Sequence, residues 1–149
     1  MSHHLDSDPA QSLKLFVILS KAYKTLMDQA VRDMKQYGLS PSEFTILEVL
    51  YTKGSIPLQQ IGDKILITSG TITYNIDKLA AKGLLRRVPC QEDRRVTFAE
   101  ITEEGNRLFD TIFPQHAGRL HSLMHGLSPE EKDAAMILLK KLGKGAAEG

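Results

Sequence analysis

The sequence predicts a mainly α-helical fold that carries a small β-hairpin. Three observations lead to this fold class. Helix-start signals recur along the 149-residue chain, an amphipathic helical pattern gives way to two β-like runs within residues 68–102, and a charged tip, residues 92–95, separates those runs. A helix followed directly by an arginine-tipped hairpin indicates a winged helix-turn-helix, which here is flanked by long helices at both ends of the chain.

Three helix starts share one motif: a cap residue, a proline at the next position, and Glu or Gln three residues after the cap. The motif occurs at residues 8–11, 40–43 and 128–131. The cap and the acidic or amide side chain satisfy free amides at the helix start, and proline loses no backbone bond there. We expect a helix to begin at the proline of each motif.

The first helix is predicted over residues 9–37, with Gly38 able to end it. Its apolar stripe is wide and runs along the whole segment. A helix of roughly 28 residues is about 42 Å long at 1.5 Å per residue. A domain of this size cannot cover such a stripe with its own core, so we expect part of it to meet another chain.

The central region is predicted to hold three shorter helices. The second helix spans residues 41–51 and a loop follows it at 52–55. The third spans 57–64. The fourth begins at its cap Thr68 and ends at Gly83.

The hairpin follows, with strands expected over residues 84–88 and 94–101. Pro89 marks the end of the first strand because proline cannot donate to a ladder. A fifth helix, residues 103–124, should be kinked at Pro114.

The last helix is expected over residues 128–142, with a frayed tail at 143–149. Residues 39–102 are then the winged helix-turn-helix. Residues 1–38 and 103–149 are expected to form a helical region around it, which we assign to dimerisation on the resemblance given below, and the two regions to make a single intertwined domain.

Composition narrows the function classes. The chain is 42% hydrophobic and 25% charged, and it has no apolar run of about 18 residues, so we expect no membrane span. The N-terminus does not read as a secretory signal, which makes the cytoplasm the expected location. With Cys90 as the one cysteine, a disulfide within the chain and a cysteine-based zinc site are excluded. We find no catalytic motif, and we expect neither enzyme activity, metal nor cofactor.

The basic charge is concentrated around the fourth helix and the hairpin. Residues 64–95 hold seven basic and three acidic side chains, although the whole chain has a net charge of only +1. A basic patch on an otherwise acidic body is typical of a phosphate-binding surface. The residues that we predict to contact DNA are Ser69, Thr71, Thr73, Tyr74, Asn75, Lys78, Arg86, Arg94 and Arg95.

Different residue types in this set suit different parts of DNA. Asn75 can pair with an adenine edge in the major groove, whereas Lys78 and Lys82 are placed for phosphates. The hairpin arginines suit a narrow minor groove, where the negative potential is strongest. We expect Asp93 beside them to orient Arg95 or to cap the turn.

At these positions the chain resembles the MarR family of bacterial transcription regulators. Two signatures carry the resemblance. The hairpin signature consists of Asp93, Arg94, Arg95, Ile101, Thr102 and Gly105. The recognition-helix signature consists of Thr71, Ile72, Thr73, Asp77, Lys78 and Leu79, followed by Lys82, Gly83 and Leu84. The resemblance covers nearly the whole chain. Tyr74 departs from it, since many members carry arginine there, so a base preference does not transfer from relatives.

The resemblance implies a homodimer whose first, fifth and sixth helices interlock, and whose two lobes bind a palindromic DNA operator. It implies repression that ends when a small aromatic or phenolic effector binds, or when a cysteine is oxidised. The run of residues 86–98 is most similar to the subgroup that responds to hydroquinones and quinones. The predicted effector-pocket residues are Phe16, Tyr23, Tyr37, Phe44 and His116.

Two other functions stay open. A thiol-based redox repressor would act through Cys90, which lies among arginines that favour the reactive thiolate. A winged-helix module that binds only protein would not need the basic hairpin. Mobility shifts at several salt concentrations separate this last class from a DNA binder, because phosphate contacts make affinity fall steeply with salt.

Overall fold

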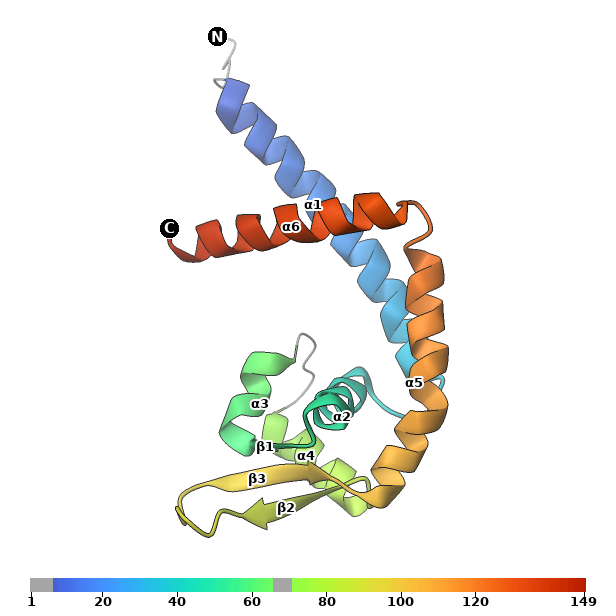
Figure 1. Ribbon diagram of the computed structural model, residues 1–149, viewed down its shortest axis with the longest axis vertical. Helices are drawn as coiled ribbons and strands as arrows, with labels where there is room; N and C mark the ends of the chain where they lie inside the picture. Colours follow the sequence, from blue (N-terminus) through green and yellow to red (C-terminus); the bar gives the residue numbers. More distant parts are fainter. Residues whose placement is uncertain (1–6, 66–70) are drawn as a thin grey trace. The chain divides into compact units, whose positions relative to one another are not determined.

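The computed structural model of the chain describes residues 7–65 and 71–149 (Figure 1). By their contacts they fall into two compact units, Met1–His116 and Ala117–Gly149. The first unit contains most of the helices and all the strands of the described residues, and the second contains the end of α5 and the whole of α6.

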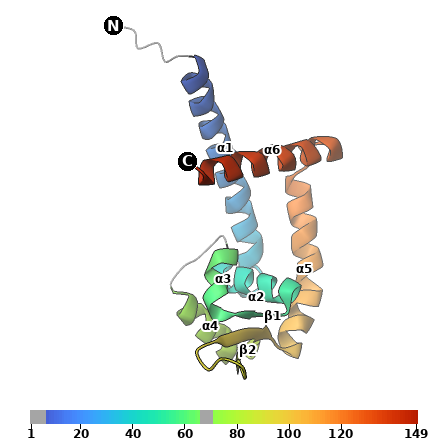
Figure 2. The ribbon, with the colours of Figure 1, turned by 60° about the vertical axis from the view of Figure 1, so that its left-hand side comes forward.

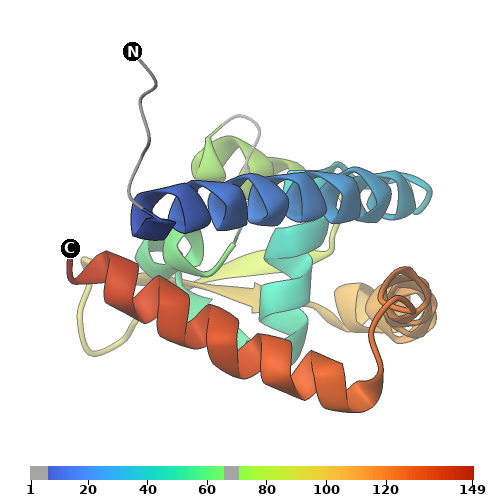
Figure 3. The same ribbon diagram turned by 90° about the horizontal axis from the view of Figure 1, so that it is seen from above.

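The helices α1, α2, α3, α4 and α5 span Ser7–Lys35, Pro41–Lys53, Leu58–Lys64, Ile72–Ala81 and Glu103–Leu123. Figure 3 shows α1 from the side as one uninterrupted helix. It begins two residues before the predicted start, and it ends at Lys35 rather than Tyr37 because three residues of turn follow. Gly38 then adopts a φ of 77°, which suits glycine and terminates the segment as expected.

The start of α2 confirms the capping motif. Ser40 Oγ accepts a hydrogen bond from the N–H of Glu43, and the N–H of Ser40 donates to Glu43 Oε1, both at 3.1 Å. The helix continues to Lys53, two residues beyond the predicted end, and Gly54 closes it with a backbone bond to Leu50.

The strands form a small antiparallel sheet in the order β1-β3-β2 (Figure 1), and Figure 2 shows the sheet from another side, with β1 next to α2. Strand β1, Ser55–Pro57, was not predicted: Ser55 was assigned to the loop and Pro57 to the start of the third helix, because three residues carry no periodic pattern. Strands β2 and β3 span Leu85–Pro89 and Thr97–Ile101. The second hairpin strand therefore starts three residues later than predicted, because the turn takes up those residues, whereas Pro89 still pairs with Thr97 at an edge where its missing N–H is tolerated.

The helix α4 begins later than the sequence indicated. Its N-cap is Thr71, whose Oγ1 accepts a hydrogen bond from the N–H of Tyr74 at 3.0 Å. The predicted N-cap, Thr68, is therefore wrong, because Thr71 caps α4. Thr68 itself lies outside the described residues. Two threonines three residues apart offer equivalent caps in the sequence, and only the fold distinguishes them.

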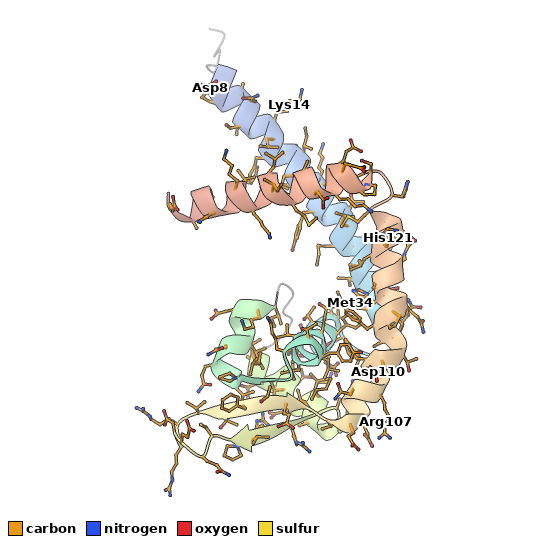
Figure 4. The ribbon with its side chains drawn as sticks, in the orientation of Figure 1. Asp8, Lys14, Met34, Arg107, Asp110 and His121 are labelled. Atoms are coloured by element: carbon orange, nitrogen blue, oxygen red, sulfur yellow. The ribbon has the colours of Figure 1, made fainter. Side chains whose placement is uncertain are left out.

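The core of the first unit joins α1, α2, α3, α4 and α5. Phe44 and Phe109 are fully buried, with ring centroids 5.1 Å apart. From α4, Ile76 and Leu79 are also fully buried, as the apolar spacing predicted. Near the end of α1, Met34 is buried as well (Figure 4). This packing fixes α4 against α2 and leaves its other face to solvent.

In the second unit, α6 spans Pro129–Ala147 and starts with the same capping box as α2. The predicted frayed tail is helical as far as Ala147, so the expected end at Leu142 was too early. All nineteen residues of α6 are described and none is buried. Over the described residues, no helix is long and apolar enough to cross a membrane.

Candidate nucleic-acid interface

The exposed face of α4 presents small and aromatic side chains. Thr71 and Thr73 are exposed, and Tyr74 exposes 56% of its surface. The Lys78 ammonium lies 5.4 Å from the centroid of the Tyr74 ring, which is within the range of a cation–π contact. A ring and an ammonium group thus stand together on the solvent side of this helix. Ser69, which we predicted to join this face, lies outside the described residues.

Asn75 is on the opposite side of α4 from the one we predicted. It is only 2% exposed, and its Nδ2 donates a hydrogen bond to the Thr71 carbonyl at 3.0 Å. Asn75 lies three residues after Ile72 and four before Leu79, so its side chain turns toward the core, where the amide bonds to the first turn of α4. Asn75 therefore supports the start of the helix, and it is not an exposed reader of base edges.

Two lysines of α4 face a buried carboxylate of α2. Lys82 Nζ donates to Glu43 Oε2 at 2.6 Å, and Lys78 Nζ lies 3.9 Å from Glu43 Oε1. Burial raises the pKa of the Glu43 carboxyl, but the hydrogen bonds from Lys82 and Ser40 outweigh it, so that the pKa lies below its ordinary value. We predicted from the sequence that Lys82 contacts DNA phosphates, whereas in the structure its ammonium is bonded to Glu43 of the same chain.

The tip of the hairpin holds one arginine in a defined orientation. Asp93 accepts bonds from Arg95 at its backbone N–H, Nε and Nη2, at 3.0, 3.1 and 3.2 Å. The bonds from Arg95 lower the pKa of the Asp93 carboxyl. The predicted orienting role of Asp93 agrees with this geometry, and the Arg95 side chain still exposes 90% of its surface.

Arg94 lies beside this pair and is also exposed. Among the described residues it has no ion-pair or hydrogen-bond partner. Figure 4 shows side chains that end in nitrogen projecting from the tip of the hairpin. The tip therefore presents two guanidinium groups, one oriented by a carboxylate and one without a partner in the described chain.

Along the strands, the other arginines are paired. Arg86 Nη2 donates to Glu100 Oε1 at 2.6 Å across the β2–β3 ladder, and Arg87 forms an ion pair with Asp77 of α4. Arg86 keeps an exposed side chain, but its charge is partly neutralised. Arg87 ties the hairpin to α4, so the two candidate DNA-contacting elements are linked directly.

The base of the hairpin is fixed by the motif that ends in Gly105. Thr102 Oγ1 donates to the Gly83 carbonyl at 2.6 Å and accepts from the N–H of Gly105 at 3.1 Å. A Cβ at Gly105 would stand 2.3 Å from the Leu84 carbonyl oxygen, so only glycine fits. These contacts join the end of α4, the hairpin and the start of α5. They give a physical reason for the spacing of Thr102 and Gly105 in the hairpin signature, which the sequence supported only by resemblance.

Three of the five predicted effector-pocket residues come together. Tyr37 stacks on Phe44 with centroids 6.0 Å apart, and Phe44 packs against His116 at 4.5 Å. Phe16 and Tyr23 do not join them, because they lie earlier on α1 and are 67% and 53% exposed. Phe16 lies 19 residues before Lys35, the last residue of α1, which is about 28 Å along a helix that rises 1.5 Å per residue.

The cluster also contains an acid that sequence reasoning missed. Asp33 is buried, and its Oδ2 lies 2.7 Å from His116 Nδ1 and accepts a bond from the Tyr37 hydroxyl at 3.1 Å. Burial and the bond to Asp33 raise the pKa of Tyr37. Glu48 Oε2 lies 4.0 Å from His116 Nε2, and burial raises the pKa of the Glu48 carboxyl. The 83-residue separation of Asp33 and His116 left no local signal in the sequence.

Cys90 lies just after β2 and is half-buried. Its N–H donates to the Val96 carbonyl at 3.0 Å, which closes the hairpin loop. Of the arginines we expected to surround it, three are engaged with carboxylates.

A short helix, a packed second helix with an exposed polar face, and a three-stranded sheet with an arginine-tipped hairpin define a winged helix-turn-helix. The family model for MarR matches residues 39–97. The chain belongs to the MarR family, and the resemblance seen in the sequence is confirmed.

Comparisons with known proteins agree with this assignment. The chain is 49% identical over 138 residues to the HTH-type transcriptional regulator MhqR of Bacillus subtilis, covering 93% of this chain and 95% of MhqR. Among solved structures, Sco3205 of Streptomyces coelicolor, a MarR family regulator in complex with DNA, has a TM-score of 0.77 at 19% identity and covers 96% of this chain and 94% of its own.

A third similar protein is BpsR of Bordetella bronchiseptica, from a structure on the regulation of its DNA binding by 6-hydroxynicotinic acid. Its TM-score is 0.71 at 25% identity, and the match covers 87% of this chain and 98% of that one. Relatives of this chain are named as transcriptional regulators, which is a non-enzymatic class.

Proposed function

We propose that this protein is a homodimeric, cytoplasmic transcription repressor that binds a palindromic operator and releases it when a small aromatic, phenolic or quinone-type effector binds. The observation that carries the proposal is the pairing of an exposed α4 face with an arginine-tipped hairpin tied to it. The helix presents Thr73 and Tyr74, the hairpin presents Arg94 and Arg95, and the Arg87–Asp77 ion pair joins the two elements.

In the DNA complex, α4 enters the major groove and the hairpin reaches the adjacent minor groove. Thr71, Thr73 and Tyr74 meet base edges or sugars, and Lys78 meets a phosphate. Arg94 and Arg95 follow the minor groove, where a narrow A·T-rich sequence attracts guanidinium groups. Arg86 contacts the backbone from the strand. The DNA complex of Sco3205 supports this arrangement through its shared fold.

Uncovered apolar side chains support the homodimer. On α1, Leu13 and Phe16 are 55% and 67% exposed, and on α6, Ile137 and Leu138 are 68% and 64% exposed. Exposed apolar area of this extent marks an interaction surface. A second copy of the chain is the occupant that a palindromic operator requires, because the two-fold symmetry of the DNA mirrors that of the protein.

The effector site is proposed at the cluster of Tyr37, Phe44 and His116. The partly exposed Tyr37 ring offers a stacking surface, while the buried Asp33 and His116 ring offer polar partners for a phenol or quinone oxygen once the effector opens the cluster. BpsR, which is regulated by an aromatic acid, supports the effector class. Phe16 and Tyr23 contribute only if the partner protomer brings them to the same site.

The test measures affinity for an operator recovered by selecting bound fragments from genomic DNA. Arg95→Ala is expected to weaken binding markedly and to lower the slope of log K against log salt by about 0.9 for each protomer in contact. Arg32→Ala, which removes an exposed arginine of α1, is the matched control and should leave both values at the wild-type level. Unchanged affinity for Arg95→Ala would refute the role of the hairpin.

Cys90→Ser tests the alternative thiol switch. If an aromatic effector is the signal, the variant releases DNA at the same effector concentration as the wild type. Loss of release in this variant would favour a redox repressor.

A further inference from the structure

The two complete capping boxes of this chain are chemically the same at the helix start. In both, the serine Oγ accepts from the backbone N–H of the glutamate at 3.1 Å. The return bond runs from the serine N–H to the glutamate Oε1, at 3.1 Å for Glu43 and 2.9 Å for Glu131. A cap needs only one carboxylate oxygen, so the second oxygen of each glutamate remains for another partner.

The second oxygen has different surroundings in the two boxes. Glu131 is exposed. The Glu43 side chain is 2% exposed, and its Oε2 accepts from Lys82, the C-cap residue of α4, at 2.6 Å. A buried carboxylate without a cation or donors is strongly unfavourable, so Glu43 requires Lys82 to stay close. The contact therefore ties the start of α2 to the end of the helix proposed to enter the major groove.

The same contact removes a charge from the DNA-facing surface. Lys82 is only 39% exposed, and its ammonium points to Glu43. An ammonium held by an internal carboxylate does not release counterions from a phosphate. Lys78, at 3.9 Å, is drawn less closely and remains available to the DNA contact proposed above.

We infer that Glu43 is a positioning residue for DNA recognition: by holding Lys82, it fixes α4 on α2 and keeps that lysine from binding phosphates of any sequence. This inference rests on the proposed DNA binding. Its consequence is selectivity, because phosphate contacts strengthen binding to every duplex alike, whereas the placement of α4 favours the operator.

The experiment uses Glu43→Gln in the full-length protein, with the selected operator and a scrambled duplex of the same length. Glutamine keeps an oxygen for the Ser40 N–H and loses the charge that holds Lys82. The slope of log K against log salt on the scrambled duplex should steepen by about 0.9 for each bound protomer. Measured against binding at 1 M salt, this tightens binding at 0.1 M salt about eightfold per protomer. The ratio of operator to scrambled affinity should fall.

Two further variants isolate the cause. Glu131→Gln removes the same charge from the exposed capping box and should leave both duplex affinities unchanged. In the double variant with Lys82→Gln, the steeper slope should disappear, because no lysine is left to release. A merely structural role for Glu43 would lower stability and both affinities without steepening the slope.

Lys82→Gln alone keeps the inference testable if Glu43→Gln does not fold. Since Lys82 is held away from phosphates, the slope of this variant should equal that of the wild type, whereas Arg94→Gln should lower it by about 0.9 per protomer. The inference is overturned if Lys82→Gln flattens the slope, if Glu43→Gln leaves it unchanged, or if the double variant keeps it steep. Absence of wild-type binding to either duplex would instead refute the proposed DNA binding.

Discussion

The helices α2 and α6 begin with the same capping box, but α2 is largely buried and α6 is not. Seven of the thirteen residues of α2 are buried, including the capping glutamate, whereas none of the nineteen residues of α6 is. The capping box thus determines where a helix begins. Whether the helix is covered depends on the elements around it, and the exposed apolar stripe of α6 is the basis of the dimer interface proposed above.

The largest expected effect tests the buried side of this comparison. Phe44→Ala in α2 removes a ring that contacts Phe109, Tyr37 and His116, and leaves a cavity. We expect a loss of about 3–5 kcal/mol in the free energy of unfolding, measured by urea denaturation. Leu138→Ala on α6 is the matched truncation, and its effect should depend on protein concentration. A loss below about 1 kcal/mol for Phe44→Ala would contradict the burial.

The next effect tests the uncovered side. The double variant Ile137→Asp with Leu138→Asp would place unpaired charges in the proposed dimer interface of α6. We expect the dimer dissociation constant to rise about a hundredfold, or about 2.7 kcal/mol, in sedimentation equilibrium. Lys141→Glu, a charge change on the same helix, serves as control. An unchanged dimer would show that the apolar stripe of α6 has another occupant.

The two caps themselves should differ in strength. Ser40→Ala and Ser128→Ala each delete one bond to a free amide, a loss of about 0.5–2 kcal/mol. We expect Ser40→Ala near the upper limit, because water cannot easily reach the buried start of α2, and Ser128→Ala near the lower one. Urea denaturation of both variants gives the comparison, and equal losses would show that burial does not change the strength of a cap.

The smallest expected effect concerns pH. The folded pKa of Glu43 lies below its unfolded value of about 4.5, so its charge stabilises the fold above that pH, and this stabilisation is lost as the pH falls through the folded pKa. The difference in unfolding free energy between the wild type and Glu43→Gln should therefore shrink in acid.

Glu48 provides the opposite case within the same helix. Its folded pKa is raised by burial, so its stabilising contribution is present below the unfolded pKa and lost as the pH rises through the folded one. Glu48→Gln should remove that dependence. Denaturation between pH 3 and 7 measures both variants, and slopes of the same sign would contradict the assignment.

Much of the fold could be read from local patterns. The capping boxes at Ser40 and Ser128 and the apolar spacing of Ile76 and Leu79 all gave the right element, because each signal is complete within one or two helical turns. Strand β1 was missed because Ser55–Pro57 becomes a strand only by pairing with β3.

The candidate interface was predicted less completely. The hairpin tip and its Asp93–Arg95 contact follow from neighbouring residues, so the sequence contained them. Asn75 was placed on the wrong face because its polar side chain outweighed its spacing, three residues after Ile72 and four before Leu79, which puts it on the buried face. Lys82 was assigned to phosphate because its partner Glu43 lies 39 residues away in the sequence.

The sequence by itself determined where α2 and α6 start, that an arginine-tipped hairpin follows α4, and to which family the chain belongs. The tertiary structure alone decided that Asp33 meets His116, that Glu43 binds Lys82, and that α2 is covered while α6 is bare. The physical reason is the separation of the interacting residues along the chain. Caps and turns form between residues a few positions apart, whereas burial and these two contacts depend on residues that only folding brings together.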